Sequence, residues 1–462
     1  MSALHYLGAA IVLLLITAVG IYSGRQVKSA KDFSSGGRSA GTAIVSGSII
    51  GTLVGGASTI GTAQLAFSFG FSAWWFTLGG GIGCLFLAVF FAKPLHESGI
   101  TTMPQIFQRE YGRTAATAVA ILTSIGSFLS IVSQMLSGVA LITAVSGIAP
   151  LLAMVLIVAL MLFYVVFGGV WGAGLVGISK TVLLYVAIGA CGVMALVLYG
   201  GVGAFTSALP AQTYFNLTAR GAPVDLGAGL SLLLGVLTTQ AYIQAIISAK
   251  SVRVSRRGAL ISAALIPLVG VGSIFVGMYM KLCYPGISPA SALPFFILEK
   301  MPPILAGGIL GTLLIALVGT GAGVSLGLSS MLCNDIYKVY INKKASDRAS
   351  LVMSRLIIVL ILVCAALFST GNLGTLILSW SFMSMGLRGA VAFVPFCMAL
   401  FLPGRVSRRN AIAAIITGPV LVLIGKFILP ATIDSLFLGV AGAALVTAFG
   451  LISGRRKRDM RL

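Results

Sequence analysis

A succession of long apolar segments constrains this 462-residue chain more than any other feature of its sequence. Hydrophobic residues make up 58% of the chain and charged residues only 8%. A soluble domain of this length needs far more charge on its surface. We therefore predict an all-α polytopic membrane protein, with candidate spans near residues 3–22, 41–68, 72–93, 115–145, 149–168, 172–200, 226–249, 258–281, 303–337, 350–370, 374–402, 410–429 and 434–453.

The basic residues are distributed unevenly between the two sides of the predicted membrane protein. If the N-terminus lies outside, the predicted inner loops and the tail hold most of the lysines and arginines, whereas the predicted outer segments keep only Arg220, Lys281, Lys300 and Lys426. This positive-inside bias predicts a cytoplasmic C-terminus in a cell inner membrane. The net charge of +21 then faces anionic lipid headgroups, so membrane lipids, and no nucleic acid, are the expected partners.

Two predicted spans contain polar interruptions. The segment 51–64 reads GTLVGGASTIGTAQ, and the segment 239–244 reads TQAYIQ inside an apolar run. Because lipid offers no partners to backbone groups, a span that loosens in mid-membrane must line a cavity or lie against protein. Such breaks are typical of the binding sites of transporters. Close packing of helices through small residues explains the same composition equally well.

The sequence contains no recognisable catalytic constellation. All nine acidic residues lie in predicted loops or at span ends, and neither a metal-binding HExxH motif nor paired intramembrane carboxylates occur. The six cysteines are scattered through apolar segments without metal-ligand spacing. We predict that the chain is not an enzyme and carries no organic cofactor or structural metal.

Several segments in order along the chain resemble the sodium/solute symporter family, which includes bacterial proline, pantothenate, sialic acid and galactose carriers. The segments are 31–38 (KDFSSGGR), 56–58 (GAS), 103–112 (MPQIFQREYG), 167–171 (FGGVW), 249–252 (AKSV), 314–320 (LIALVGT) and 334–338 (NDIYK). The resemblance implies the leucine-transporter fold with two inverted five-helix repeats and about thirteen helices. It divides the chain into an extra N-terminal helix and basic loop (1–40), a first repeat (41–200), a second repeat (226–403), and two C-terminal helices with a basic tail (409–462).

The resemblance also implies a cation site between the first and eighth core helices, at Ala57, Ile60, Ala316, Gly319 and Thr320. Oxygen ligands suit a hard cation such as sodium. In this chain Gly319 replaces a hydroxyl ligand, and in the fifth core helix Lys180 stands where the family has a glutamine. A lysine this deep in a span either snorkels to the inner surface, pairs with a neighbouring helix, or replaces the bound cation. We therefore expect Lys180 to reach Thr320 and Ala57, and transport to be sodium-independent, either proton-coupled through Lys180 or uncoupled.

The expected solute chamber lies between the two broken spans. Its candidate residues, each of which could instead form a helix-to-helix hydrogen bond, are Ser58, Thr59, Gln64, Gln134, Thr239, Gln240, Tyr242 and Gln244. Arg388 adds an intramembrane cation that no nearby acid answers, so it either lines an aqueous vestibule or binds an anionic group. The sequence thus predicts a symporter that moves a small polar, anionic or zwitterionic solute by alternating access. An ordinary sodium symporter, a passive facilitator and a transport-like sensor are the alternatives, and the oligomeric state is left open.

Overall fold

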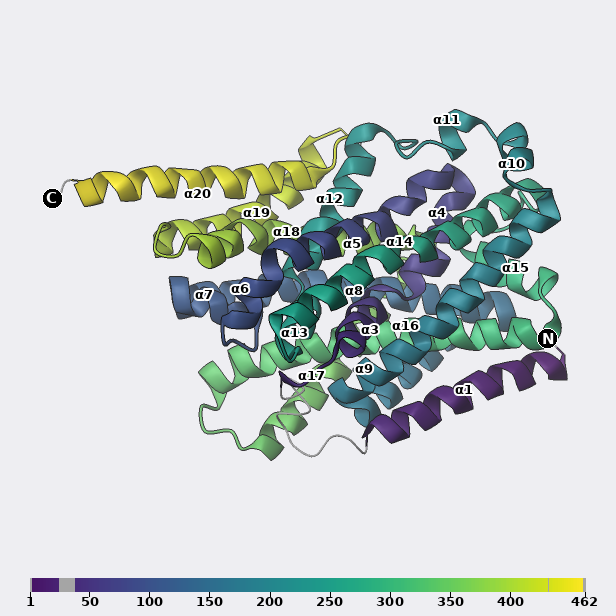
Figure 1. Cartoon of the computed structure of the whole chain (residues 1–462), viewed down its shortest axis with the longest axis horizontal. Helices are drawn as coiled ribbons and strands as arrows, with labels where there is room; N and C mark the ends of the chain where they lie inside the picture. The colour runs from purple at the N-terminus through teal and green to yellow at the C-terminus, as the bar shows by residue number, and fades with distance from the viewer. Residues whose placement is uncertain (1, 25–37, 431, 460–462) are drawn as a thin grey trace.

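The computed structural model describes the backbone of residues 2–24, 38–430 and 432–459, and the side chains of residues 2–19, 38–165, 177–430 and 432–451. Most of the predicted basic first loop, the motif at 167–171 and the predicted basic tail therefore lie outside the described side chains. In the described part of the chain, helices account for all of the larger elements. Most of them run along the long axis of the molecule, side by side (Figure 1).

The first half of the chain forms the helices α1 (Ala3–Gly24), α3 (Thr42–Leu53), η2 (Ala57–Gly61), α4 (Thr62–Phe69), α5 (Trp75–Phe86), η4 (Leu87–Phe91), α6 (Ala92–Glu97), α7 (Met103–Tyr111), α8 (Arg113–Ser146), α9 (Pro150–Tyr199), α10 (Val202–Ala208) and α11 (Ala211–Tyr214). The second half forms α12 (Ala222–Thr238), α13 (Gln240–Ser248), α14 (Val252–Cys283), α15 (Ala292–Lys300), α16 (Pro303–Leu332), η6 (Cys333–Ile341), α17 (Asp347–Thr370), α18 (Ile377–Phe401), α19 (Arg408–Ile428) and α20 (Ser435–Asp459). Short 3₁₀ turns η3 (Gly70–Trp74) and η5 (Pro289–Ser291) complete the set.

Among the described residues, eight helices are long and apolar enough to cross a membrane, or nine if the bent pair α12–α13 counts as one span. Shorter apolar helices lie at Ala3–Val19, Thr42–Leu53, Pro150–Val165 and Ser435–Leu451. The predicted spans 149–168 and 172–200 both fall within α9, and the boundary predicted between them lies outside the described side chains. The multi-pass architecture agrees with the sequence, whereas the count of about thirteen spans stays a prediction.

The first predicted break is present between α3 and η2. Val54 follows α3 with an extended backbone (φ −90°, ψ 106°), and the chain then continues as the π-helix η2 and the helix α4. Two glycines allow other helices to approach here. A Cβ at Gly55 would lie 2.6 Å from Thr320 Oγ1, and a Cβ at Gly56 would lie 2.4 Å from Ser137 Cβ. Close packing and a broken helix, which we treated as alternatives, therefore occur together at this segment.

The second predicted break is at Thr239, which adopts an extended backbone (φ −89°, ψ 125°) between α12 and α13. The two helices are bent by 47° relative to each other. Beyond the break, α13 ends close to the start of α3: the Ala40 N–H donates to the Ser248 carbonyl at 3.0 Å, and the Lys250 N–H donates to the Ala40 carbonyl at 3.1 Å. The start of the first broken span and the end of the second are thus held next to each other.

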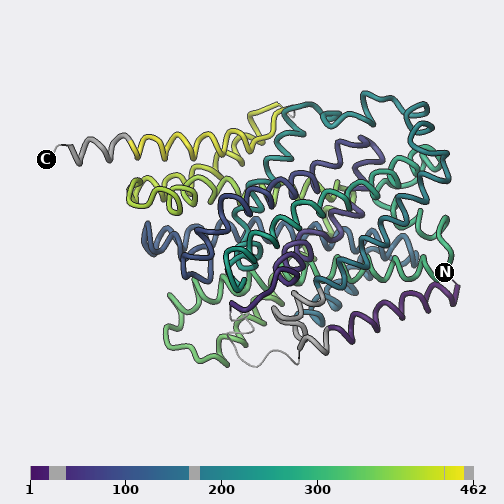
Figure 2. Tube along the Cα trace, in the orientation of Figure 1, coloured from purple at the N-terminus to yellow at the C-terminus, as the bar shows by residue number. Residues whose placement is uncertain are grey.

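The remaining helices surround this broken pair. Around the first break, α9 and α16 contact α3, and α8 contacts η2, α9 and α16. Around the second break, α12 contacts α5 and α18. The helix α1 packs on α16 and α9, and α19 and α20 pack on each other and on α18. The trace in Figure 2 shows α1 and α20 at opposite edges of the bundle. The two breaks therefore lie in the interior, where neighbouring helices can satisfy the backbone groups that the breaks expose.

Candidate functional site

The backbone groups that the first break exposes are bound by side chains. The Gly55 N–H donates to Ser58 Oγ, and the Gly56 N–H donates to Gln134 Oε1 from α8, each at 2.9 Å. Thr59 Oγ1 donates to the Gly55 carbonyl at 2.9 Å. Ser58, Thr59 and Gln134 are buried. They replace the helical hydrogen bonds lost at the break, and their predicted contact with a solute stays a prediction.

Lys180 extends from α9 into the same region and is only 2% exposed. Its Nζ donates to Thr320 Oγ1 at 2.9 Å and to the Ala316 carbonyl at 3.2 Å, both on α16. Thr320 Oγ1 in turn lies 3.1 Å from the Gly51 carbonyl and 3.2 Å from the Val54 carbonyl, at the end of α3. The lysine therefore connects α9 and α16 to the broken span, and its amine is buried between these helices.

The distance between Lys180 and Thr320 agrees with the reach expected from the sequence. Ala57, the other expected neighbour, instead has its carbonyl paired with Thr62 Oγ1 at 3.3 Å. Gly319, which has no side chain, lies next to the same amine, since a Cβ there would be 3.5 Å from Lys180 Nζ. The lysine amine thus lies beside the position at which the expected hydroxyl is missing.

Two of the oxygens expected to bind sodium contact the Lys180 amine instead. A sodium ion needs several oxygen ligands and is repelled by an ammonium group. Here the ammonium of Lys180 takes two of the expected oxygens, those of Ala316 and Thr320, and Gly319 supplies no side-chain oxygen. Ile60, another expected carbonyl ligand, is buried within η2.

Arg388 lies in α18 beside the second break and is 1% exposed. Its Nη1 donates to Thr239 Oγ1 and its Nη2 donates to Ser384 Oγ, each at 2.8 Å, while its Nε donates to the Ser384 carbonyl at 3.1 Å. Every one of these acceptors is neutral. The ion pair that the described residues contain joins Arg220 and Asp225, so the described residues give Arg388 no carboxylate partner.

The neighbours of Arg388 come from several elements. A Cβ at Gly126 of α8 would lie 2.6 Å from Arg388 Cγ, so this glycine makes room for the arginine. Tyr242 of α13 is buried within electrostatic reach of the guanidinium. Ser384 is not among the residues expected from the sequence, although its position four residues before Arg388 puts both on one helix face. Tyr164 is also not among them, and its hydroxyl would lie 3.4 Å from a Cβ at Gly319.

The side chains of two predicted chamber glutamines bind backbone groups of other helices. Gln64 Oε1 accepts from the Ile377 N–H at 2.9 Å, and its Nε2 donates to the Thr375 carbonyl at 3.3 Å, which connects α4 to the start of α18. Gln240 Oε1 accepts from the Met103 N–H at 2.7 Å, at the start of α7. Gln244 lies in α13, half-buried. The structure therefore contains two groups of polar contacts. The lysine centre consists of Lys180 and its partners at the first break, and the arginine centre consists of Arg388 and its partners at the second.

The comparisons with known proteins agree with this architecture. The model of the sodium:solute symporter family matches residues 33–418. The chain is 23% identical to the osmoregulated proline transporter OpuE of Bacillus subtilis over 90% of this chain and 87% of that protein. It is 25% identical to the sodium/sialic acid symporter SiaT of Proteus mirabilis over 94% and 91%. It is also 23% identical to the high-affinity choline transporter 1 of Drosophila melanogaster over 77% of this chain, but spans only 60% of that protein.

Solved structures show the same fold. A Na⁺-coupled sialic acid symporter in a substrate-bound outward-open state superposes with a TM-score of 0.80 over 98% of each chain, at 19% identity. The inward-facing conformation of Mhp1 gives a TM-score of 0.58 over 92% of this chain and 93% of that chain, at 15% identity. All of these proteins are transporters with the leucine-transporter fold. The chain therefore belongs to the sodium:solute symporter family, as a multi-pass secondary transporter and not an enzyme.

Proposed function

We propose that this transporter moves a small anionic or zwitterionic organic solute, and that Arg388 binds the carboxylate of that solute. The observation that carries this proposal is a guanidinium that is 1% exposed and whose partners in the described structure are neutral. A buried cation without a counter-charge is costly, and an intramembrane ionisable group is typically functional. A carboxylate matches the planar fork of donors that arginine presents.

The position of Arg388 supports the same role. Its Nη1 contacts Thr239, the residue at which α12 gives way to α13. A carboxylate bound at this point would therefore lie beside the break between two helices. Transporters of this architecture bind their solutes at such breaks. Two of the relatives are named as transporters of proline and sialic acid, which carry carboxylates, whereas a third is named as a transporter of choline, which is a cation.

Binding to the purified protein tests this proposal. Thermal shift with L-proline, sialic acid, myo-inositol and choline separates carboxylates from a neutral polyol and an organic cation. We expect stabilisation by a carboxylate that Arg388→Gln removes and that Arg388→Lys restores in part. The matched control is Arg109→Gln, which removes an exposed arginine whose Nη1 donates to the Ser98 carbonyl. Stabilisation by choline that survives Arg388→Gln would overturn the proposal.

We further propose that transport does not use sodium at the first break, because Lys180 takes the place of the cation. Support comes from the donation of Lys180 Nζ to Thr320 Oγ1 and to the Ala316 carbonyl, and from the missing side chain at Gly319. Loss of the Lys180 proton would remove its charge and one of its N–H donors, so it would loosen the link between α9, α16 and α3. Proton-coupled transport through Lys180 is therefore the proposed mechanism, and uncoupled transport is the alternative that the same missing ligands favour.

Uptake into proteoliposomes distinguishes these mechanisms. The protein is reconstituted and uptake of a stabilising carboxylate is followed under an imposed sodium gradient, an imposed proton gradient, or neither. We expect stimulation by the proton gradient alone, and its loss in Lys180→Ala. Equal uptake under all three conditions would indicate an uncoupled facilitator. Uptake that requires sodium and is unaffected by Lys180→Ala would overturn the proposal and leave an ordinary sodium symporter.

The membrane orientation belongs to the same proposal. The excess of lysine and arginine in alternate loops favours an external N-terminus and a cytoplasmic C-terminus in the cell membrane. On this orientation, α10, α11 and the beginning of α12 face outside. Labelling of a cysteine introduced at Ser2 by an impermeant maleimide in intact cells tests it, and labelling only after the cells are opened would contradict it.

A further inference from the structure

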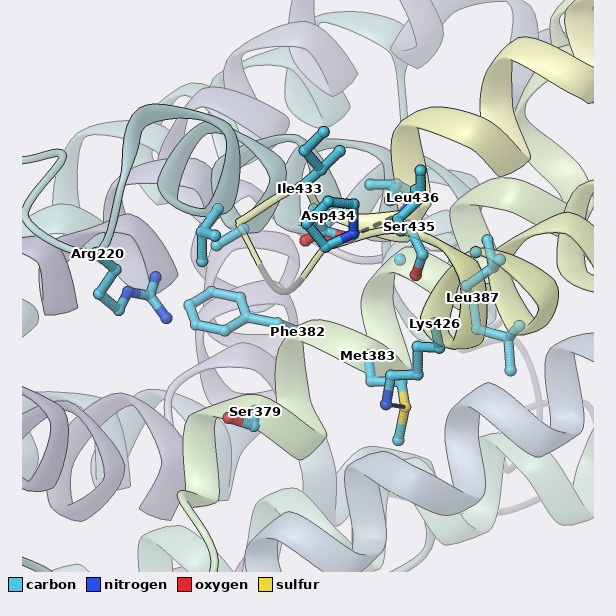
Figure 3. Close-up of a pocket in the computed structure, with 18 residues that line it drawn as sticks. Arg220, Ser379, Phe382, Met383, Leu387, Lys426, Ile433, Asp434, Ser435 and Leu436 are labelled. Atoms are coloured by element: carbon cyan, nitrogen blue, oxygen red, sulfur yellow. Dashed lines mark hydrogen bonds between the residues drawn. The ribbon is translucent and has the colours of Figure 1, made fainter.

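A cavity of about 370 Å³ lies between α12, α18, the end of α19 and the start of α20 (Figure 3). This volume falls within the roughly 300–1,000 Å³ that small-molecule sites occupy. Its polar and aromatic lining includes Arg220, Ser231, Ser379, Phe382, Lys426 and Asp434. The cavity therefore combines a partly enclosed space with charged groups from separate segments of the chain, as a binding site for a small solute requires.

Arg220 and Lys426 both lie within electrostatic reach of Asp434, but the ion pair that the described residues contain at the cavity joins Arg220 to Asp225. Arg220 pairs with Asp225, Nη2 to Oδ1 at 2.6 Å, and its guanidinium lies 5.5 Å from the centre of the Phe382 ring. Lys426 Nζ contacts Met383 Sδ at 3.1 Å, and among the described residues it forms no ion pair. Asp434 uses Oδ1 to accept the Leu436 N–H at 2.9 Å. Among the described residues, the Lys426 ammonium and the Asp434 carboxylate thus form no direct ion pair.

Lys426 enters the cavity from α19 and Asp434 from the connection just before α20, with the Phe382 ring on a third side (Figure 3). We propose that this cavity is a second binding site, for a small zwitterion whose carboxylate contacts Lys426 and whose ammonium group faces Asp434. The ring of Phe382 and the side chain of Met383 give an apolar wall for the body of the solute. A solute with both charges matches the two unpaired groups at once, whereas a simple cation or anion leaves one of them uncompensated.

The cavity shares two helices with the arginine centre. Gly386 and Leu387 of α18 line it, directly before Arg388, and Ser231 of α12 lines it, eight residues before Thr239. At the helical rise of 1.5 Å per residue, those eight residues span about 12 Å. The cavity lies on the side predicted to be external, so it is placed to receive a solute before the solute reaches Arg388. The proposal rests on the proposed function only for the class of solute.

Protection of an introduced thiol tests the second site. Ser379 lines the cavity and is exposed, so Ser379→Cys adds a thiol with little change in volume. The full-length variant is reconstituted in phosphatidylcholine liposomes and its labelling at position 379 by an impermeant methanethiosulfonate is followed by mass spectrometry. Glycine, L-alanine, L-serine and L-proline are the probes, each at 10 mM. For a Kd of about 1 mM, we expect at least one of them to slow labelling about tenfold.

Three further variants in the Ser379→Cys background make the result specific. Lys426→Gln should abolish protection, whereas the matched control Lys300→Gln should keep it, since Lys300 lies over Tyr284 on another part of the predicted outer side. Arg388→Gln should also keep protection while it abolishes uptake, so failure of the proposed function and failure of this site give different results. Absence of protection by all four probes, or protection that survives Lys426→Gln, would overturn the proposal.

A lipid headgroup shares the charge chemistry of the proposed solute. The experiment is therefore repeated in liposomes that contain phosphatidylglycerol or phosphatidylethanolamine in addition to phosphatidylcholine. Unchanged labelling in the absence of amino acids supports a site for a free solute. Slower labelling caused by either lipid alone would overturn the proposal and assign the cavity to a headgroup.

Discussion

The double substitution Lys180→Ala and Gly319→Ser should convert this transporter into one that binds sodium. Lys180→Ala removes the ammonium from Thr320 Oγ1 and the Ala316 carbonyl, and Gly319→Ser restores the missing hydroxyl beside them. The new side chain fits, because a Cβ at Gly319 would meet Tyr164 Oη at 3.4 Å and Lys180 Nζ at 3.5 Å, both ordinary van der Waals contacts.

The magnitude follows from the same distances. Lys180 Nζ lies 2.9 Å and 3.2 Å from the two oxygens, so a sodium ion bound to them would lie within about 4 Å of the amine. Two unit charges at 4 Å repel each other by about 4 kcal/mol when the effective dielectric constant is about 20, which is about a thousandfold in affinity. The added hydroxyl contributes about 1.5–3 kcal/mol, or roughly ten- to a hundredfold.

Binding of radioactive sodium to the purified protein measures the effect directly, and solute uptake under a sodium gradient measures its consequence. We expect no saturable sodium binding by the natural protein at millimolar concentrations, weak binding by Lys180→Ala, and the tightest binding by the double variant. Gly319→Ser alone is the matched control, because it adds the hydroxyl and keeps the repelling charge. It should remain indifferent to sodium.

Two results would refute this reasoning. Millimolar sodium binding by the natural protein would mean that the ammonium does not exclude the ion. Failure of the double variant to bind sodium, when it retains the folded, monodisperse behaviour of the natural protein, would mean that the oxygens around Thr320 do not form a cation site.

Three other substitutions test the packing and polar contacts. Gly56→Ala would place a Cβ 2.4 Å from a side-chain carbon of α8 and should destabilise the protein by about 1–3 kcal/mol, whereas Gly323→Ala, with open space around it, should not; thermal unfolding in detergent compares them. Asp225→Asn should cost about 3–5 kcal/mol in the same assay, since it leaves Arg220 without its partner. Gln64→Ala should cost about 1–3 kcal/mol through its lost contacts with α18 and change solute affinity less than about tenfold; a larger loss in a binding titration would place Gln64 in the solute site.

The sequence alone determined the class of the protein and the position of its two interior breaks. Apolar segments of membrane-spanning length require a helical bundle, because each span must satisfy its own backbone hydrogen bonds. Glycines and hydroxyl residues at 51–64 and polar residues at 239–244 marked the places where those bonds are interrupted. The missing hydroxyl at Gly319 and the added charge at Lys180 were also visible, because family resemblance supplies the register in which one residue replaces another.

Only the tertiary structure decided which polar groups meet. Gln64, Gln134 and Gln240 have the same side-chain type in similar apolar surroundings, yet they bind α18, the Gly56 N–H and the start of α7, respectively. No local pattern separates these outcomes, because each depends on which distant helix lies within about 3 Å of the amide. The neutral partners of Arg388 and the cavity at Lys426 have the same origin, since they exist only where α12, α18 and their neighbours come together.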